Sequence, residues 1–446
     1  MRSCWLALLL FFLSQPIYAQ ATFSEPVNLQ QCLSIALEQS ASVNEAEAKI
    51  DLHRAKLSEV QSNYYPKLSV LGYLAPMFTV NGNAFTQDVD REFDLGSWGP
   101  STHLEALLAM PIYTFGRLES GEYAAKERLA VEKARLREAQ NHVKLEVKKF
   151  YYTYLYAKTM LPHLKKAEGF VAETLVEAKK LYDASTGKVT KVDLQKLKFA
   201  EAEVKKYILQ SEEGISLAMS ALKHTMGLEE NATLELIESK IPKPVADWQT
   251  KNMAELLSFA KENRPEWQQI HHGLKAATAF RQSETKSKLP ILFVAGTIEH
   301  SWAPTRDDSK NPYHYDPYNE LFGGVAVGVK WDLDWYLTKA KVQAANATLK
   351  EVTALKQLAV TGIPLQVKKS LSESQRFYKQ VKLSRKAQKA ASKWIAFAGT
   401  AYSSGTGEVK DVLEGMVAML TAKRDYYENM LNFHVAKAEL DYAIGQ

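Results

Sequence analysis

The sequence predicts a mainly α-helical fold that also carries a few β-strands suited to a membrane. Three observations support this class. Two stretches, residues 115–184 and 338–402, keep a helical pattern far beyond the length of an ordinary globular helix. A segment near Val325 alternates apolar with small or polar residues, as a membrane strand does. The two halves of the chain also follow one order of elements, which indicates an internal duplication.

The first 21 residues predict a secretory signal peptide. They read MRSCWLALLLFFLSQPIYAQA, with an apolar core too short to span a bilayer, which disfavours the alternative of a retained anchor. Cleavage after Ala19 and after Ala21 both satisfy the small-residue rule, and Ala19-Gln20-Ala21 is the better match to A-x-A. Processing removes Cys4 and leaves Cys32 alone, which excludes a disulfide framework. Cys32 falls on the apolar face of a helix and is expected in the core.

Charge and apolarity exclude a nucleic-acid-binding protein and a mature chain with a membrane-spanning helix. Lys and Arg number 56 against 51 Asp and Glu, a formal net charge of +5. No stretch is dense enough in basic residues for a nucleic-acid groove, so no nucleic acid is expected as a partner. After the signal peptide, no apolar run approaches the ~20 residues of a membrane helix. Any membrane insertion by the mature chain therefore has to use strands.

The first repeat, residues 22–227, is predicted to begin with a capping box at Asn28 and a helix that ends before Pro66. Its expected elements are a helix over 28–63, a strand in YYPKLSVLGYLAPMF, an exposed loop over 81–100, a strand over 103–113, and helices over 115–184 and 190–226. Pro162 is expected to kink or break the long helix, because it removes a backbone hydrogen bond and clashes with the preceding turn.

The second repeat, residues 249–446, follows a linker at residues 228–248. LPILFVAG aligns with YPKLSVLG, so that Pro290 matches Pro66 at an offset of 224 residues. Its expected elements are a helix over 252–286, a strand over 288–298, a loop over 301–320, a strand over 322–336, a long helix over 338–402 kinked at Gly362 and Pro364, and a final helix to about 444. The order of the first repeat is thus restated.

The last predicted strand carries the clearest membrane pattern. Val325, Val327, Val329 and Trp331 share one face, which is apolar and suits lipid, while the other face suits a wet lumen. Two strands per repeat give four per chain, which cannot close a barrel, and each backbone group left unpaired in lipid costs several kcal/mol. Closure therefore requires several chains. Three copies supply twelve strands, although the strand count alone does not fix the number at three.

These features, in this order, resemble the outer membrane efflux protein family, the TolC type of exit duct, over nearly the whole mature chain. The resemblance rests on the signal peptide, NLQQCLSIALEQS, YYPKLSV, MPIYTFGR, YSSGTGEVKDVLEGMVAML, and two turns in which Gly187 and Gly405 each precede an aspartate by six residues. It implies a homotrimer with a twelve-stranded β-barrel in the outer membrane of a Gram-negative bacterium. Long helical hairpins would form an α-helical barrel through the periplasm. Implied partners are a periplasmic adaptor protein, an inner-membrane transporter and outer membrane lipid.

The resemblance also assigns roles to the two turns, as hairpin tips at the periplasmic mouth. Acidic residues after the second tip line the entrance in the family, and they map by motif onto Asp411 and Glu414, with Asp193 in the equivalent place of the first repeat. A threefold ring of carboxylates concentrates cations. The alternative for these acids is a solvated position that favours the dipole of a helix. The implied tip and adaptor-contact residues are Gly187, Val189, Gly405, Gly407 and Val409.

Catalytic motifs are absent from the sequence. There is no phosphate-binding loop, HExxH, GxSxG or CxxC, and the adjacent His271 and His272 face different sides of a helix. No enzymatic activity, cofactor or metal is therefore expected. The expected function is a passive outer membrane exit duct of a tripartite efflux or type I secretion system, whose cargo is left open between drugs, metal ions and polypeptides. The alternative is a periplasmic helical adaptor or scaffold without a pore, which has no need of lipid-facing strands.

Overall fold

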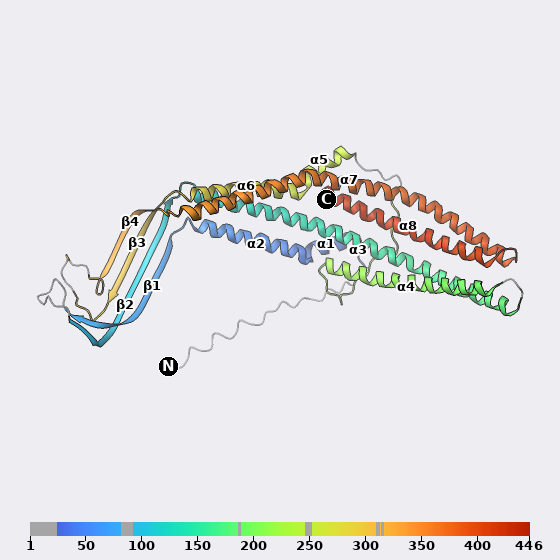
Figure 1. Ribbon diagram of the computed structural model, residues 1–446, viewed down its shortest axis with the longest axis horizontal. Coiled ribbons are helices and arrows are strands. Elements are labelled where there is room, and N and C mark those ends of the chain that lie inside the picture. Colours follow the sequence, from blue (N-terminus) through green and yellow to red (C-terminus); the bar gives the residue numbers. More distant parts are fainter. Residues whose placement is uncertain (1–24, 82–91, 186–188, 246–251, 309–312, 314–315) are drawn as a thin grey trace. The chain divides into compact units, whose positions relative to one another are not determined.

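The computed structural model describes residues 25–81, 92–185, 189–245, 252–308, 313 and 316–446 (Figure 1). The predicted signal peptide, Gly187 and the end of the predicted linker lie outside these residues. The chain forms two compact units that cut across the repeats. The hairpin unit contains the described residues up to 47 together with 135–267 and 359–446, and the sheet unit contains 48–134 and 268–358.

Most of the chain is helical, as the sequence predicts. They are α1 Leu29–Gln39, α2 Ala41–Ser62, α3 Arg117–Asp183, α4 Lys191–Thr225, α5 Met253–Asn263, α6 Pro265–Lys286, α7 Trp335–Ser403 and α8 Val409–Ala443. The predicted capping box is confirmed, because Asn28 N–H donates to Gln31 Oε1 at 2.8 Å and Gln31 N–H donates to Asn28 Oδ1 at 2.9 Å. Among the described residues, none of the helices combines the length and the apolarity needed to cross a membrane.

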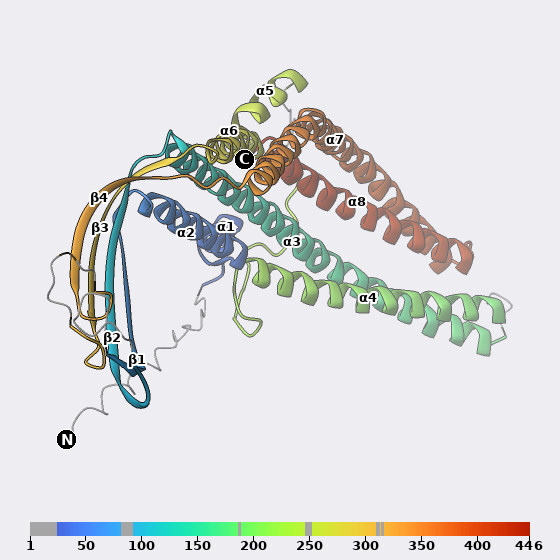
Figure 2. The ribbon, with the colours of Figure 1, turned by 60° about the vertical axis from the view of Figure 1, so that its left-hand side comes forward.

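Four strands form one antiparallel sheet in the order β1-β2-β3-β4 (Figure 2). They are β1 Lys67–Asn81, β2 Glu92–Tyr113, β3 Ile291–Trp302 and β4 Leu321–Lys330. Both repeats thus contribute a hairpin to the same sheet. Within the described chain, β1 and β4 are its two edges, and each keeps one side without a strand partner.

Each repeat opens with two helices where the sequence predicts one. The expectation of unbroken helices over 28–63 and 252–286 is wrong, because the backbone turns extended at Ser40, with ψ 130°, and at Arg264, with ψ 126°. Arg264 precedes Pro265, which disfavours helical geometry in the residue before it and then begins α6. Ser40 and Arg264 are separated by 224 residues, the offset already seen between the strands, so the interruption belongs to the repeated plan.

A glycine in the left-handed conformation packs against each of these breaks. Gly227, with φ +74°, and Gly445, with φ +88°, follow the last helix of each repeat. A Cβ on Gly227 would lie 2.2 Å from the backbone oxygen of Gln39, and one on Gly445 would lie 2.8 Å from the backbone nitrogen of Arg264. Only glycine allows both the positive φ and this approach of two backbones. The end of each repeat therefore packs against the break near its beginning.

The two long helices are continuous, so the break that the sequence allows at Pro162 does not occur, whereas a kink stays a prediction. α3 passes through Pro162 and α7 passes through Gly362 and Pro364 without a break. Pro162 is exposed, so water can reach the carbonyl that loses its helical donor. The many intact turns on either side outweigh the loss of one hydrogen bond.

Strand boundaries also differ from the prediction. β2 begins at Glu92, so residues 92–100 are strand rather than loop. β3 continues to Trp302. β4 ends at Lys330, which leaves Trp331 outside the strand, and α7 begins at Trp335. The glycines and Pro100 of this stretch made it appear irregular, but Gly99 and Pro100 pair with β1, and Gly96 lies where the register of the two strands shifts.

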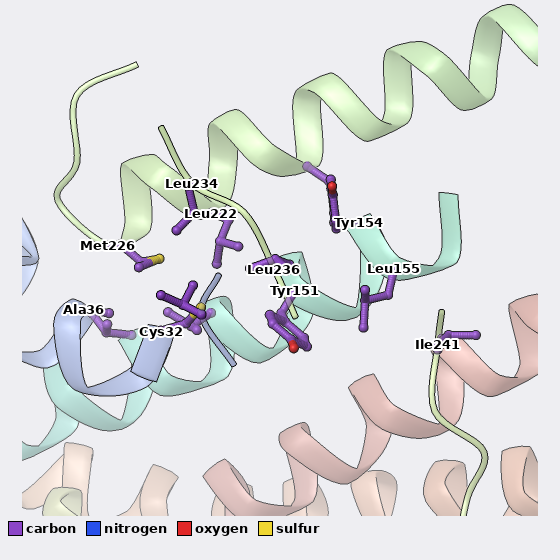
Figure 3. Packing of buried hydrophobic residues seen from close by; sticks show 14 of the residues in the cluster. Cys32, Ala36, Tyr151, Tyr154, Leu155, Leu222, Met226, Leu234, Leu236 and Ile241 are labelled. Carbon is purple, nitrogen blue, oxygen red and sulfur yellow. The ribbon is translucent and has the colours of Figure 1, made fainter. Parts of the chain in front are cut away.

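The core of the hairpin unit lies where α1, α3 and α4 meet the segment after α4 (Figure 3). Cys32 is fully buried there beside Tyr151 and Leu222, as expected for a core residue. Burial raises the pKa of the Cys32 thiol to about 12, so the reactive thiolate does not form near neutral pH. Leu234, Leu236 and Ile241 of the segment after α4 are buried as well and fasten it to the helices.

Candidate functional site

The first turn ends in a complete capping box. Thr190 N–H donates to Asp193 Oδ2 at 3.0 Å, and Asp193 N–H donates to Thr190 Oγ1 at 3.2 Å. The Thr190 hydroxyl also donates to Asp193 Oδ2 at 2.6 Å. These hydrogen bonds, with the charge of Lys196, hold the pKa of Asp193 below its ordinary value. The carboxylate of Asp193 is therefore engaged in starting α4.

The second turn has the same spacing but no such cap. Glu408 is the N-cap residue of α8 and makes no side-chain capping bond. Asp411 is exposed and forms no side-chain hydrogen bond or ion pair with any residue that the structure describes. Glu414, one turn further along α8, is also exposed, with Lys410 Nζ at 3.8 Å from its Oε1. Two carboxylates thus face solvent at the start of α8.

The valines at the two turns are packing residues. Val189 is 6 % exposed and Val409 is 3 % exposed, and both belong to one cluster with Ala178 and Leu197. This cluster joins the end of one hairpin to the end of the other. Of the predicted contact residues that the structure describes, Gly405, with φ +79°, is exposed and Gly407 is half-buried.

Tyr402 has a buried hydroxyl group next to these valines. It packs against the valine cluster, and its buried oxygen has no hydrogen-bond partner among the described residues. Burial and the negative charges of Glu177 and Asp193 raise the pKa of Tyr402. The hydroxyl therefore stays protonated and can still donate to an acceptor.

One face of the sheet is apolar over all four strands. The register pairs Val70 with Ala106, Ala106 with Ile298, and Ile298 with Gly323, so residues of one parity share a face across the whole sheet. Exposed apolar residues on this face are Leu68, Val70 and Leu74 of β1, Leu104 and Leu108 of β2, Ile298 of β3, and Val325, Val327 and Val329 of β4. The predicted valines of β4 are 82 %, 74 % and 61 % exposed, in chain order.

Aromatic side chains flank this apolar band. Trp98 and Trp302 lie at the end where β2 begins and β3 ends. Tyr65, Trp331, Trp335 and Tyr336 lie at the other end, next to the helices, and all of these rings are exposed. Trp331 is fixed there by its Nε1–H, which donates to Lys288 O at 2.9 Å. Between Leu292 and Trp302 the strand rises by ~33 Å, or ~25 Å at a tilt of about 40°.

The opposite face of the sheet, called the polar face here, carries charged and polar side chains beside the exposed Leu71, Tyr73 and Phe322. Such a face was predicted from the last strand alone, and its charged residues were not singled out. Glu105 lies directly opposite Glu299, and His103 lies opposite Ser301. His103 Nδ1 is 3.0 Å from Ser301 Oγ and 3.7 Å from Glu299 Oε1, while its ring stacks on Tyr73. The signal was the opposite phase of HLEALLAM, whose His and Glu alternate with the leucines.

The segment after β3 folds over this polar face. A Cβ on Gly99, whose parity places it on the polar face, would meet Thr305 Cγ2 at 2.3 Å. Val80 N–H donates to Thr305 O at 3.2 Å, and the Arg306 guanidinium lies 5.1 Å from the ring of Phe78 and 4.9 Å from that of Tyr318. These contacts carry the segment across β2 to β1.

Within the described residues, no group of three or more His, Cys, Asp or Glu side chains is arranged to hold a metal ion. His272 pairs instead with Glu127, its Nδ1 lying 2.6 Å from Glu127 Oε2. The chemistry of the two turns and the sheet is thus one of exposed charge, apolar surface and unpaired strand edges.

Comparisons with known proteins agree with this arrangement. The family model described as outer membrane efflux protein matches residues 32–228 and 256–446. No curated protein matches the chain at the sequence level.

Solved structures match over nearly the whole chain. A membrane protein from Pseudomonas aeruginosa is 16% identical, with a TM-score of 0.77, over 94% of this chain and 93% of its own. The outer membrane protein VceC from Vibrio cholerae is 16% identical, with a TM-score of 0.73, over 94% and 96%. The CmeC outer membrane channel of Campylobacter jejuni is 14% identical, with a TM-score of 0.75, over 97% and 90%. At these identities the likeness concerns the fold.

Proposed function

The chain belongs to the outer membrane efflux protein family, and on this premise we propose that three copies form a passive exit duct through the outer membrane. The observation that carries the proposal is the sheet, which has one apolar exposed face and two edges without a strand partner in the described chain. Such a surface is unstable in water, and such edges are unstable in lipid until each finds a partner.

Joining β4 of one copy to β1 of the next satisfies both requirements. Three copies of four strands give a closed sheet of twelve, within the range of membrane barrels. The apolar band then faces lipid between its aromatic girdles, at about the height of the apolar region of a barrel. Glu105, Glu299 and His103 face the lumen, which is polar and suits an aqueous path.

The turns of the helical hairpins form the entrance of the proposed path. We assign the entrance carboxylates to Asp411 and Glu414, because both are exposed and Asp411 takes no part in capping. Asp193 remains in the proposal as a third carboxylate whose first task is to cap α4. Repetition in three copies makes a ring that concentrates cations and raises the barrier to anions.

The proposed duct works with partners that supply the energy. A periplasmic adaptor protein would contact the exposed surface around Gly405 and Gly407, and an inner-membrane transporter would deliver the cargo. Val189 and Val409 are not part of that contact surface, because they are buried within one chain. A tripartite efflux system and a type I secretion system both fit this geometry, with drugs, metal ions or polypeptides as cargo.

The test is conductance of the purified protein in a planar lipid bilayer. We expect discrete, cation-selective steps that a trivalent cation blocks from the side of the helical turns. The double variant Asp411→Ala with Glu414→Ala should lose most of the block and of the cation preference. The control removes two exposed carboxylates elsewhere, by Glu229→Ala with Glu262→Ala, and should conduct like the unchanged protein.

Two results would contradict the proposal in different ways. Unchanged selectivity and block in the double variant would remove the carboxylates from the entrance and leave the duct in place. Folded protein that inserts into no bilayer and is recovered from the soluble periplasmic fraction would favour the scaffold function instead.

A further inference from the structure

A stacked pair of rings joins α3 to α8 in the hairpin unit. The rings of His163 and Tyr427 lie 5.4 Å apart between centroids, with an interplanar angle of 17°. His163 Nε2 is 3.1 Å from Tyr427 Oη. This pair lies away from the hairpin turns, and the proposed duct makes no use of it.

Two lysines flank the pair from the two helices. Lys166 lies three residues after His163 on α3, and Lys423 lies four residues before Tyr427 on α8. Residues at these spacings share a face of a helix. Each helix therefore carries one lysine on the face that bears its own ring.

A third lysine comes from the segment after α4. Ile241 of that segment is buried, and its N–H donates to Thr159 Oγ1 at 2.9 Å, one turn before His163 on α3. Lys240 precedes Ile241 and is exposed. Three separate segments thus bring one lysine each to the same neighbourhood.

No acidic side chain balances these lysines among the residues that the structure describes. Burial and the charges of Lys423, Lys240 and Lys166 together lower the pKa of His163, and burial with the charge of Lys166 lowers that of Lys423. Lys165, the next residue along, pairs instead with Glu212 at 3.0 Å. A half-buried ammonium group without a counter-charge is costly, and an anion relieves that cost.

We propose that Lys166, Lys240 and Lys423, with the His163–Tyr427 pair, form a binding site for a phosphate or phosphomonoester group. Lysine ammonium groups bind phosphate as compact point charges, and a phosphoryl group offers several acceptor oxygens to several donors. A dianion matches the local excess of positive charge better than a chloride ion does. All five residues belong to one chain, so this proposal does not depend on whether the assembled protein conducts.

Calorimetric titration of the full-length protein with inorganic phosphate, at an ionic strength kept constant with chloride, tests the site. We expect saturable binding of one phosphate per chain. Lys423→Gln and Lys166→Gln should each weaken it at least tenfold. Lys165→Gln is the matched control, because it removes the same charge from the neighbouring residue and should bind as before.

Two outcomes would overturn the site: no saturable binding by the unchanged protein, or an equal loss in Lys165→Gln. A second measurement guards against misfolding, since without phosphate Lys423→Gln should unfold at a higher temperature than the parent. A lower unfolding temperature would mean that Lys423 already has a counter-charge, which contradicts the proposal. Competition by glycerol 3-phosphate would extend the site to phosphomonoesters, and failure to compete would restrict it to free phosphate.

Discussion

At Gly227 and Gly445 the fold leaves no room for a side chain. Alanine at position 227 meets a positive φ and a backbone oxygen only 2.2 Å away, so the end of the repeat must move off α1. We expect Gly227→Ala to destabilise the protein by about 2 kcal/mol or more. Thermal unfolding of the purified protein measures this.

Gly169→Ala serves as the control for that substitution. Gly169 lies inside α3 with nothing within 4 Å of an added Cβ, so alanine should stabilise the helix by up to about 1 kcal/mol. If Gly227→Ala unfolds at the same temperature as Gly169→Ala, the proposed role of the left-handed glycines is wrong.

Asp193 and Asp411 occupy equivalent positions and should respond differently to substitution and to pH. Asp193→Ala removes the capping bonds and should cost about 1 kcal/mol at neutral pH, whereas Asp411→Ala should change stability little. The folded pKa of Asp193 is lowered, so its contribution is full above the unfolded pKa and fades as pH falls through the folded one. Unfolding of the parent and both variants at pH 7 and pH 3 tests this. A pH-independent difference for Asp193→Ala would contradict it.

At the scale of elements, the sequence predicted the order and nearly all the long elements but not their interruptions. Hydrophobic periodicity reports the average face of a helix and does not mark a break of a single residue such as Ser40 or Arg264. What breaks the helix at Ser40 is the approach of Gly227, which lies far away in sequence. At Arg264 the local signal, Pro265, was present in the sequence and was not used.

The prolines inside the long helices do not end them. Pro162 and Pro364 are local signals for a break, yet the structure keeps both helices continuous. Long-range packing along each hairpin decides the outcome, and a single-residue propensity does not. The polar face was predicted from the last strand alone, and its charged residues in β2 and β3 were not, because the leucines of HLEALLAM gave the stronger pattern.

At the scale of the whole molecule, the number of copies is the main quantity that the chain alone does not fix. The sheet demands closure, and the family places the protein in the outer membrane. Native mass spectrometry of the detergent-purified protein should give three chains per particle, because three sheets make the proposed barrel of twelve strands. A particle of two or four chains would contradict that barrel while leaving the fold of each chain unchanged.

The two repeats differ in length in only one region, and that region is informative. The offset between equivalent residues is 224 at the helix breaks, but it is 218 from the start of α3 to Gly227, as shown by 335 minus 117 and by 445 minus 227. The difference of six residues therefore lies in the strands and their connections. The two hairpins therefore contain the same number of residues.

One added residue in a helix advances its end by about 1.5 Å and turns it by about 100°. If the residue were added to one hairpin alone, Val189 and Val409 would no longer lie at the same height and could not pack together. The apolar face of the lengthened helix would also turn away from the neighbouring helix. We therefore expect insertions and deletions to be tolerated in the loops that join β1 to β2 and β3 to β4. Between the hairpin turns and the sheet, the same changes should destabilise the protein. A graft between two such ducts should exchange loops freely, but hairpins only as a matched pair.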